Sequence, residues 1–201
     1  MATPARELLW PQPRWRPLRL ADLVYVAALE AQIHAAPWTI GNFRDALAAG
    51  YSARVGERDF RIVAYGVLMP APGEAQVLNL SVVPDARRQG LGRSLLRQFV
   101  EDARNLNAGQ IFLEVRTSNI PAIRLYESEG FAPVARRTDY YPSASPEGPR
   151  EDAIVMRRAL AVGPDRAKAG ADGKSGGIQI TMVCKNKSAR RKNSIKNSLN
   201  R

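Results

Sequence analysis

The sequence of 201 residues has one cysteine, Cys184, and one histidine, His34. A single cysteine cannot form an internal disulfide, and one cysteine with one histidine cannot supply the usual ligands of a zinc site, so we expect no metal. No apolar run approaches the roughly 20 residues that span a bilayer, and the first residues lack the charged-then-apolar pattern of a signal peptide. These absences argue against a secreted or membrane-spanning protein and predict a cytoplasmic one.

Lysine is absent from the first 162 residues, whose 20 arginines and 17 acidic residues give a net charge of +3. Residues 163–201 contain all six lysines, four arginines and two aspartates, a net charge of +8. Because the positive charge lies in this last segment, the total of +11 does not indicate a specific nucleic-acid-binding domain. Its Gly-, Ser- and Asn-rich composition is typical of a disordered tail, and the alternative is an arm that binds ribosomes or RNA as polyanions.

Hydrophobic residues make up 45% of the sequence, enough for one substantial core. We expect an N-terminal extension over residues 1–13, a folded domain over 14–162 and the basic tail over 163–201. Periodicity and turn residues predict strands near 14–18, 53–55, 60–69, 75–83, 110–116, 133–138 and 152–159, and helices near 22–35, 39–50, 90–107 and 121–125. This order predicts an α+β fold, in which a mixed, mostly antiparallel sheet of six to seven strands carries helices on both faces.

A glycine-bearing loop, Arg87-Arg88-Gln89-Gly90-Leu91-Gly92, lies between a predicted strand and a predicted helix. Gly90 and Gly92 lack the Cβ atoms that would block a pyrophosphate, and the free N–H groups of the helix's first turn point toward it. The loop arginines and Arg93 add positive charge. No Gly-Lys-Ser/Thr follows and a third glycine is missing, which disfavours a P-loop or a dinucleotide fingerprint. A turn flanked by solvated arginines is the alternative interpretation.

The pattern Arg-x-x-Gly-x-Gly resembles the acyl-coenzyme A motif of the GNAT acetyltransferases. The run Leu113–Asn119, with Leu125-Tyr126-Glu127 after it, resembles the corresponding block of one branch, the ribosomal-protein-alanine N-acetyltransferases of the RimI type. Ala36–Thr39 and the pair of segments Arg137–Pro142 and Glu151–Met156 resemble other parts of that branch. The resemblance covers about residues 15 to 160 and implies a GNAT-type sandwich fold with acetyl-CoA as the co-substrate.

Two residues carry the chemistry that this resemblance implies. Strand alternation places Glu114 on the face opposite Ile111 and Leu113, which overlooks a cleft if the apolar face is the core. RimI-type enzymes use a glutamate here as a general base acting through water, and a tyrosine at the position of Tyr126 as the acid that protonates the departing thiolate. The alternatives are a surface carboxylate paired with Arg116 or Arg124, and a tyrosine that packs the helix end.

The resemblance also implies binding roles. Backbone groups of Leu80-Ser81-Val82 would pair with the pantetheine arm and hold the thioester carbonyl, and Asn119 would contact the coenzyme. Acceptor-groove roles fall on Trp38, Tyr140, Tyr141 and Asp152. Trp38 could equally be a core residue. His34 receives no role, because a lone histidine on an amphipathic helix is more often a satisfied surface or core group.

The pKa of the acceptor amine favours a protein N-terminus. An α-amine has a reference pKa near ~8 and a lysine near ~10.4, so neutralising the α-amine costs about 3 kcal/mol less. The resemblance implies the N-terminal alanine of a small-subunit ribosomal protein as acceptor. One alternative is a GNAT enzyme acting on a lysine side chain or a small-molecule amine. The other is a non-catalytic acyl-CoA-binding module that docks on ribosomes, which the presence of both Glu114 and Tyr126 disfavours.

Overall fold

The computed structural model of the chain describes residues 11–143 and 148–161. The predicted tail over 163–201 and most of the predicted extension over 1–13 lie outside the described residues, so the domain boundaries stay predictions. No helix within the described ranges is long and apolar enough to cross a membrane.

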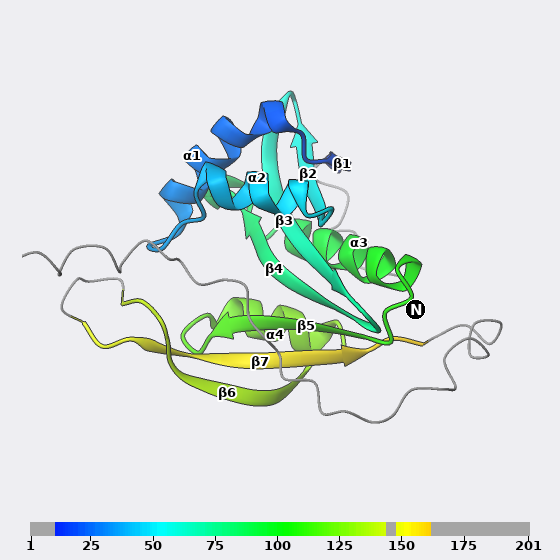
Figure 1. Cartoon of the computed structure of the whole chain (residues 1–201). Coiled ribbons are helices and arrows are strands. Elements are labelled where there is room, and N and C mark those ends of the chain that lie inside the picture. Colours follow the sequence, from blue (N-terminus) through cyan, green and yellow to red (C-terminus); the bar gives the residue numbers. More distant parts are fainter. Residues whose placement is uncertain (1–10, 144–147, 162–201) are drawn as a thin grey trace, which may run out of the picture. The chain divides into compact units, whose positions relative to one another are not determined.

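Seven strands form one sheet in the order β1-β2-β3-β4-β5-β7-β6 (Figure 1). All neighbouring strands are antiparallel except β4 and β5, which are parallel. This confirms the predicted α+β fold with a mixed, mostly antiparallel sheet. The elements are β1 (Arg14–Pro17), α1 (Leu23–Ile33), α2 (Ile40–Ala48), β2 (Ser52–Arg58), β3 (Arg61–Ala71), β4 (Glu74–Val82), α3 (Leu91–Asn105), β5 (Gln110–Arg116), α4 (Ile120–Ser128), β6 (Ala132–Tyr141) and β7 (Glu151–Ala159).

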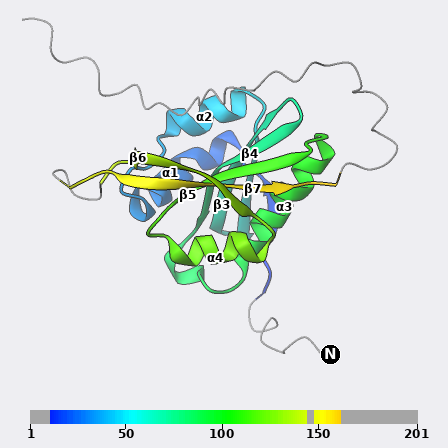
Figure 2. The ribbon, with the colours of Figure 1, turned by 90° about the horizontal axis from the view of Figure 1, so that it is seen from below.

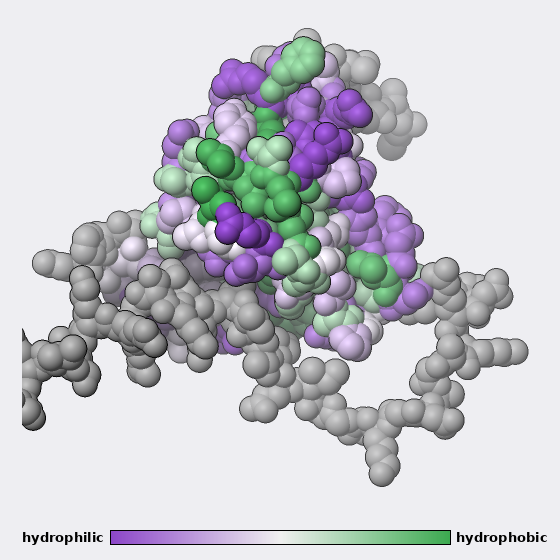
Figure 3. All heavy atoms as spheres, turned by 45° about the horizontal axis from the view of Figure 1, so that its top comes forward, coloured by the Kyte–Doolittle hydropathy of each residue, from purple (hydrophilic) through white to green (hydrophobic). Residues whose placement is uncertain are grey.

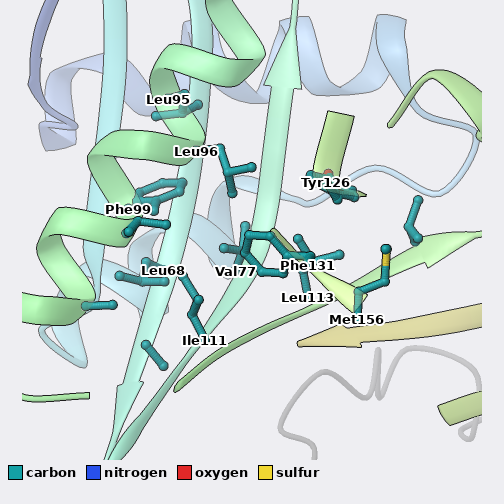
Figure 4. Packing of buried hydrophobic residues seen from close by; sticks show 14 of the residues in the cluster. Leu68, Val77, Leu95, Leu96, Phe99, Ile111, Leu113, Tyr126, Phe131 and Met156 are labelled. Carbon is teal, nitrogen blue, oxygen red and sulfur yellow. The ribbon is translucent and has the colours of Figure 1, made fainter. Parts of the chain in front are cut away.

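The helices cover the two faces of the sheet. Helices α1 and α2 lie on one face, and α3 and α4 lie on the other (Figure 2). From α3, Leu95, Leu96 and Phe99 pack with strand residues in one buried cluster (Figure 4), while Phe43 of α2 belongs to a second cluster on the opposite face. The α1 face is not wholly polar, because Val24 is 71% exposed, and Figure 3 shows hydrophobic side chains among polar ones on the surface.

Strands β4 and β5 pair only over their first halves. The pairing runs from Glu74–Val77 against Gln110–Leu113, and the strands then diverge (Figure 1). On the other side of β4, the register against β3 shifts at Val67, which is the sign of a β-bulge that bends the strand. Residues 78–82 of β4 therefore have backbone groups facing β5 without a β5 partner in the described part of the chain.

Gly66 of β3 allows the other side of β4 to pack closely. A Cβ there would lie 2.5 Å from the backbone oxygen of Asn79 and 2.9 Å from Phe99 Cε2. Any side chain at this position would push β4 and α3 away from β3. The position of the diverging half of β4 thus depends on a glycine remote from the loop motif.

Candidate active site

The glycine-bearing loop connects the diverging end of β4 to α3. Gly90 is the residue before the helix and has φ +79, and a Cβ there would meet no atom within 4 Å. The first amides of α3 have no partner inside the helix. The open space beside Gly90 is compatible with a pyrophosphate, and the binding role of the loop stays a prediction.

Gly92 has a second role that the loop motif does not reveal. A Cβ there would lie 3.3 Å from Leu125 Cδ2 and 3.8 Å from side-chain atoms of Leu80 and Val82. Gly92 therefore lets the start of α3 pack against α4 and β4. A large side chain at this position would disturb packing as well as any ligand.

Most of the polar side chains of the loop already have protein partners. Arg87 Nε donates to the backbone oxygen of Val82 (3.2 Å), and Gln89 accepts from Arg58 Nη1 (2.7 Å). Arg93 donates to Ser128 Oγ (3.1 Å) at the end of α4 and pairs with Glu129, the next residue (3.0 Å). These contacts hold the loop in place. Arg88 is exposed and has no such contact among the described residues, so it is the loop cation best placed to meet an anion.

Glu114 lies on the face of β5 opposite the core, as its alternation predicts. Ile111, Leu113 and Val115 are buried on the α3 side. The carboxylate of Glu114 is only 10% exposed, and its Oε1 lies 2.8 Å from Arg137 Nε of β6. The alternative that pairs it with Arg116 or Arg124 is therefore wrong.

The surroundings of Glu114 make it a stronger base than an ordinary carboxylate. Burial raises its pKa, and this effect outweighs the Tyr140 hydrogen bond and the positive charge of Arg137, which both lower it. A carboxylate with a raised pKa accepts a proton more readily near neutral pH. This property fits the general-base role.

Tyr126 is buried in α4, with 7% of the residue exposed, and its ring packs against Phe131 at a centroid distance of 6.1 Å. Burial raises the pKa of Tyr126 to about 12, so the phenol keeps its proton at neutral pH. Burial also raises the pKa of Tyr141, and the negative charge of Glu114 adds to this effect. The acid role of Tyr126 stays a prediction.

Tyr140 and Tyr141 form an aromatic wall beside Glu114. Their ring centroids are 5.0 Å apart in an edge-on arrangement. The guanidinium of Arg116 lies 4.4 Å from the Tyr141 ring centroid, and that of Arg137 lies 5.8 Å from Tyr140. The predicted pair of groove tyrosines thus lies at the predicted base.

Glu151 at the start of β7 holds Arg116 and the turn before α4. It pairs with Arg116 Nη1 (3.0 Å) and accepts from Thr117 Oγ1 (3.1 Å) and the Ser118 backbone N–H (2.7 Å). Hydrogen bonds from Ser118 lower the pKa of Glu151 to about 2. The sequence did not single out this carboxylate.

Three other predicted site residues have structural contacts. The side chain of Asp152 accepts from the Asp139 backbone N–H (2.9 Å) and from Arg136 Nε (2.6 Å), and Asn119 caps α4 by accepting from the Ala122 N–H (3.3 Å). The Trp38 ring packs against Phe43 at 5.2 Å. The predicted ligand contacts of these three residues stay predictions.

The structure also contains a polar cluster that sequence reasoning missed. Glu30, Asn79 and Ser81 are buried polar residues, and they join Tyr65 and His34 through hydrogen bonds between α1, β3 and β4. The available signal was Glu30 itself, since it lies on the same helical stripe as the buried Val26 of α1. A charged residue on an apolar stripe indicates a buried polar contact.

A family model described as the acetyltransferase (GNAT) family matches residues 6–131. Because this match covers more than half of the sequence, the chain belongs to the GNAT acetyltransferase family, whose members take the acetyl group from acetyl-CoA. The loop, the diverging strands and the α+β sheet described above are thus those of an acetyl-CoA-dependent N-acetyltransferase.

Within this family the chain is similar to ribosomal protein bS18-alanine N-acetyltransferases. The enzyme of Escherichia coli is 36% identical over 139 residues, which cover 69% of this chain and 92% of that protein. A Bacillus subtilis protein described as a putative enzyme of this kind is 34% identical over 143 residues, covering 70% of this chain and 91% of that protein. The predicted RimI-type resemblance is confirmed.

Solved structures agree. The crystal structure of the S18-alanine N-acetyltransferase from Escherichia coli has a TM-score of 0.69 at 32% identity, covering 76% of this chain and 97% of that chain. Ard1 from Thermoplasma volcanium has a TM-score of 0.66 at 27% identity, covering 74% of this chain and 97% of that chain.

Proposed function

We propose that this chain acetylates the N-terminal alanine of ribosomal protein bS18 in the cytoplasm, using acetyl-CoA. The observation that carries the proposal is Glu114, a nearly buried carboxylate whose pKa is raised by burial, which follows Leu113, the last β5 residue paired with β4. The relatives named for this activity support the choice of acceptor.

Backbone groups of the chain would hold the co-substrate, which supplies an activated acetyl thioester when bound. The β4 segment Leu80–Val82 has main-chain groups facing β5 without a partner there, which suits an extended pantetheine arm. Open space at Gly90 and the first amides of α3 suit its pyrophosphate. Arg88 is the exposed cation beside them.

Two side chains would move the protons. Glu114 takes a proton from the acceptor ammonium through a water molecule, which leaves the amine lone pair free for bond formation. Tyr126 gives its proton to the departing sulfur and recovers one later from solvent. The tyrosines 140 and 141, with Trp38 and Asp152, shape the groove for the acceptor peptide.

Mass spectrometry of acetylated peptides tests this function. The protein is incubated with acetyl-CoA and bS18-like peptides that differ only in the first residue, with an N-terminally blocked peptide containing lysine, and with a polyamine. We expect acetyl groups on the α-amine of the alanine-starting peptide. Preferential modification of lysine or polyamine would replace the proposed acceptor. Coenzyme binding without any product would support a binding module instead.

A further inference from the structure

A chain of hydrogen bonds runs from α1 to the diverging half of β4. Glu30 is 2% exposed and accepts from the Tyr65 hydroxyl (2.6 Å), Asn79 Nδ2 (3.0 Å) and the Trp38 backbone N–H (3.3 Å). All of these partners donate, so Glu30 is satisfied as a carboxylate. Ser81 Oγ in turn donates to Asn79 Oδ1 at 3.1 Å.

The chain of hydrogen bonds fixes the tautomer of His34, whose Nε2 lies 2.8 Å from Ser81 Oγ. Asn79 cannot turn its amide around, because Oδ1 would then face the Glu30 carboxylate. The single hydroxyl hydrogen of Ser81 is needed by the buried Asn79 Oδ1. Nε2 of His34 must therefore carry a hydrogen and donate to Ser81. The lone pair of the neutral ring is then on Nδ1.

The contacts of His34 exclude a catalytic triad with Ser81 as nucleophile. Glu30 Oε2 lies 3.6 Å from Nε2, the same ring nitrogen that contacts Ser81. In a triad the acid holds the other ring nitrogen, so that Nε2 is free to take the serine proton. Here Nε2 donates to Ser81 and cannot accept from it.

The His34 ring is partly exposed and lies on the same side of the sheet as Glu114. Its side chain is 40% exposed, whereas the side chain of Glu30 is buried. Ser81 belongs to the half of β4 that diverges from β5, and its contact with His34, the residue after α1, places its side chain on the α1 and α2 face. Glu114 faces the same side of the sheet, because Leu113 and Val115 are buried on the α3 side.

We propose that Nδ1 of His34 binds the acceptor peptide by accepting a hydrogen bond from an N–H group near its N terminus. This proposal rests on the proposed function. Glu30 is then a positioning residue, since its contacts with Asn79 and the Trp38 N–H hold the hydrogen-bond chain and the α1–α2 connection in place. The expected ligand is a peptide backbone, whose N–H groups can donate to an acceptor atom held in a fixed position.

Two substitutions at His34 separate this role from a structural one. In His34→Gln the side-chain amide can still donate to Ser81, but no acceptor remains at the position of Nδ1. In His34→Asn the amide oxygen lies near that position, but the side chain is too short to reach Ser81. We expect KM for the alanine-starting peptide to rise about tenfold in His34→Gln, because one hydrogen bond to the peptide is lost. The rise should be clearly smaller in His34→Asn. We expect kcat and KM for acetyl-CoA to change less than twofold.

A larger rise of the peptide KM in His34→Asn than in His34→Gln would mean that His34 serves only the contact with Ser81, and it would overturn the proposal. An unchanged peptide KM in His34→Gln, or equal losses in both variants, would also overturn it. Thermal unfolding verifies that both variants fold. We expect them to fold because the His34 ring is partly exposed. If the wild-type protein does not acetylate the peptide, the proposed function is overturned as well. If the wild-type protein is active but the peptide KM values of the two variants are in the opposite order, only the role of His34 is overturned.

Discussion

Glu114 Oε1 on β5 lies 2.8 Å from Arg137 Nε on the edge strand β6, with β7 between the two strands. Neither atom has a hydrogen-bond partner among the residues that the structure describes, so the two groups attract each other by charge without the alignment of a hydrogen bond. Burial raises the pKa of Glu114 and Arg137 lowers it. The basicity of the candidate base is therefore set partly by a residue from a distant part of the sequence.

Replacing Arg137 with glutamine should move the acid limb of kcat/KM to higher pH. Loss of the cation destabilises the Glu114 carboxylate, so its pKa rises further and more of the base is protonated at a given acidic pH. The shift is measured in the pH profile of kcat/KM with the alanine-starting peptide. Arg157→Gln removes the same charge from the exposed surface of β7 and should leave the limb in place. If the acid limb of kcat/KM lies at the same pH in Arg137→Gln and in the wild type, Arg137 does not influence the pKa of the base.

The substitution Glu114→Gln should lower kcat about 10²- to 10⁴-fold, because the amide cannot accept the proton. Acetyl-CoA affinity, measured by calorimetry, should stay the same. Activity should recover partly at high pH, where more of the acceptor amine is neutral without help.

A matched control is Asp102→Asn. Asp102 of α3 is also a buried acid, but it pairs with Arg54 and accepts from Ser52, which both lie on β2. This variant should lose thermal stability and keep its turnover per folded molecule. Equal turnover in Glu114→Gln and wild type would show that Glu114 is not the base.

In Tyr126→Phe only a hydroxyl is lost, so packing against Phe131 and acetyl-CoA binding should persist. We expect kcat to fall about 10- to 100-fold, since the departing thiolate is no longer protonated by the chain. High pH should not restore the rate, in contrast to Glu114→Gln. A pH-dependent rescue like that of Glu114→Gln would contradict the acid role.

Gly90→Ala tests the pyrophosphate loop better than a bulky residue at Gly92, which would strike Leu125. A methyl group at Gly90 fills open space where the phosphate would approach, and it places alanine at φ +79. Gly50→Ala is a matched control, because Gly50 has φ +75 and equally open space at the end of α2. Both variants should lose about 1 kcal/mol of stability, but only Gly90→Ala should bind acetyl-CoA at least tenfold more weakly. If both variants bind acetyl-CoA with the same affinity, Gly90 is not part of the binding site.

Local features of the site were predictable because they follow from short-range geometry. A strand alternates its side chains whatever its neighbours are, so the face of Glu114 could be predicted from Ile111, Leu113 and Val115. A glycine before an amphipathic helix likewise predicted the loop at Gly90. Both predictions rest on residues within one element.

Contacts between distant strands were not predictable in this way. Arg116 and Arg124 are near Glu114 in sequence, yet the partner of Glu114 is Arg137, because β7 inserts between β5 and β6 and its register brings Arg137 opposite Ala153. The short side chain of Ala153 leaves room for Arg137 to extend across β7. Such a register depends on the pairing of the whole hairpin.

The sequence by itself determined the order of the elements, the glycine-bearing loop, the face of Glu114 and the presence of Tyr126, since periodicity and backbone freedom are properties of local segments. Only the tertiary structure decided that Arg137 is the charge partner of Glu114, that most loop side chains are engaged with neighbouring elements, and that Glu30 is hydrogen-bonded inside the protein. The physical reason is burial. The pKa of Glu114 and the tautomer of His34 depend on which groups from separate elements exclude water and donate hydrogen bonds, and this is fixed only when the sheet and helices pack.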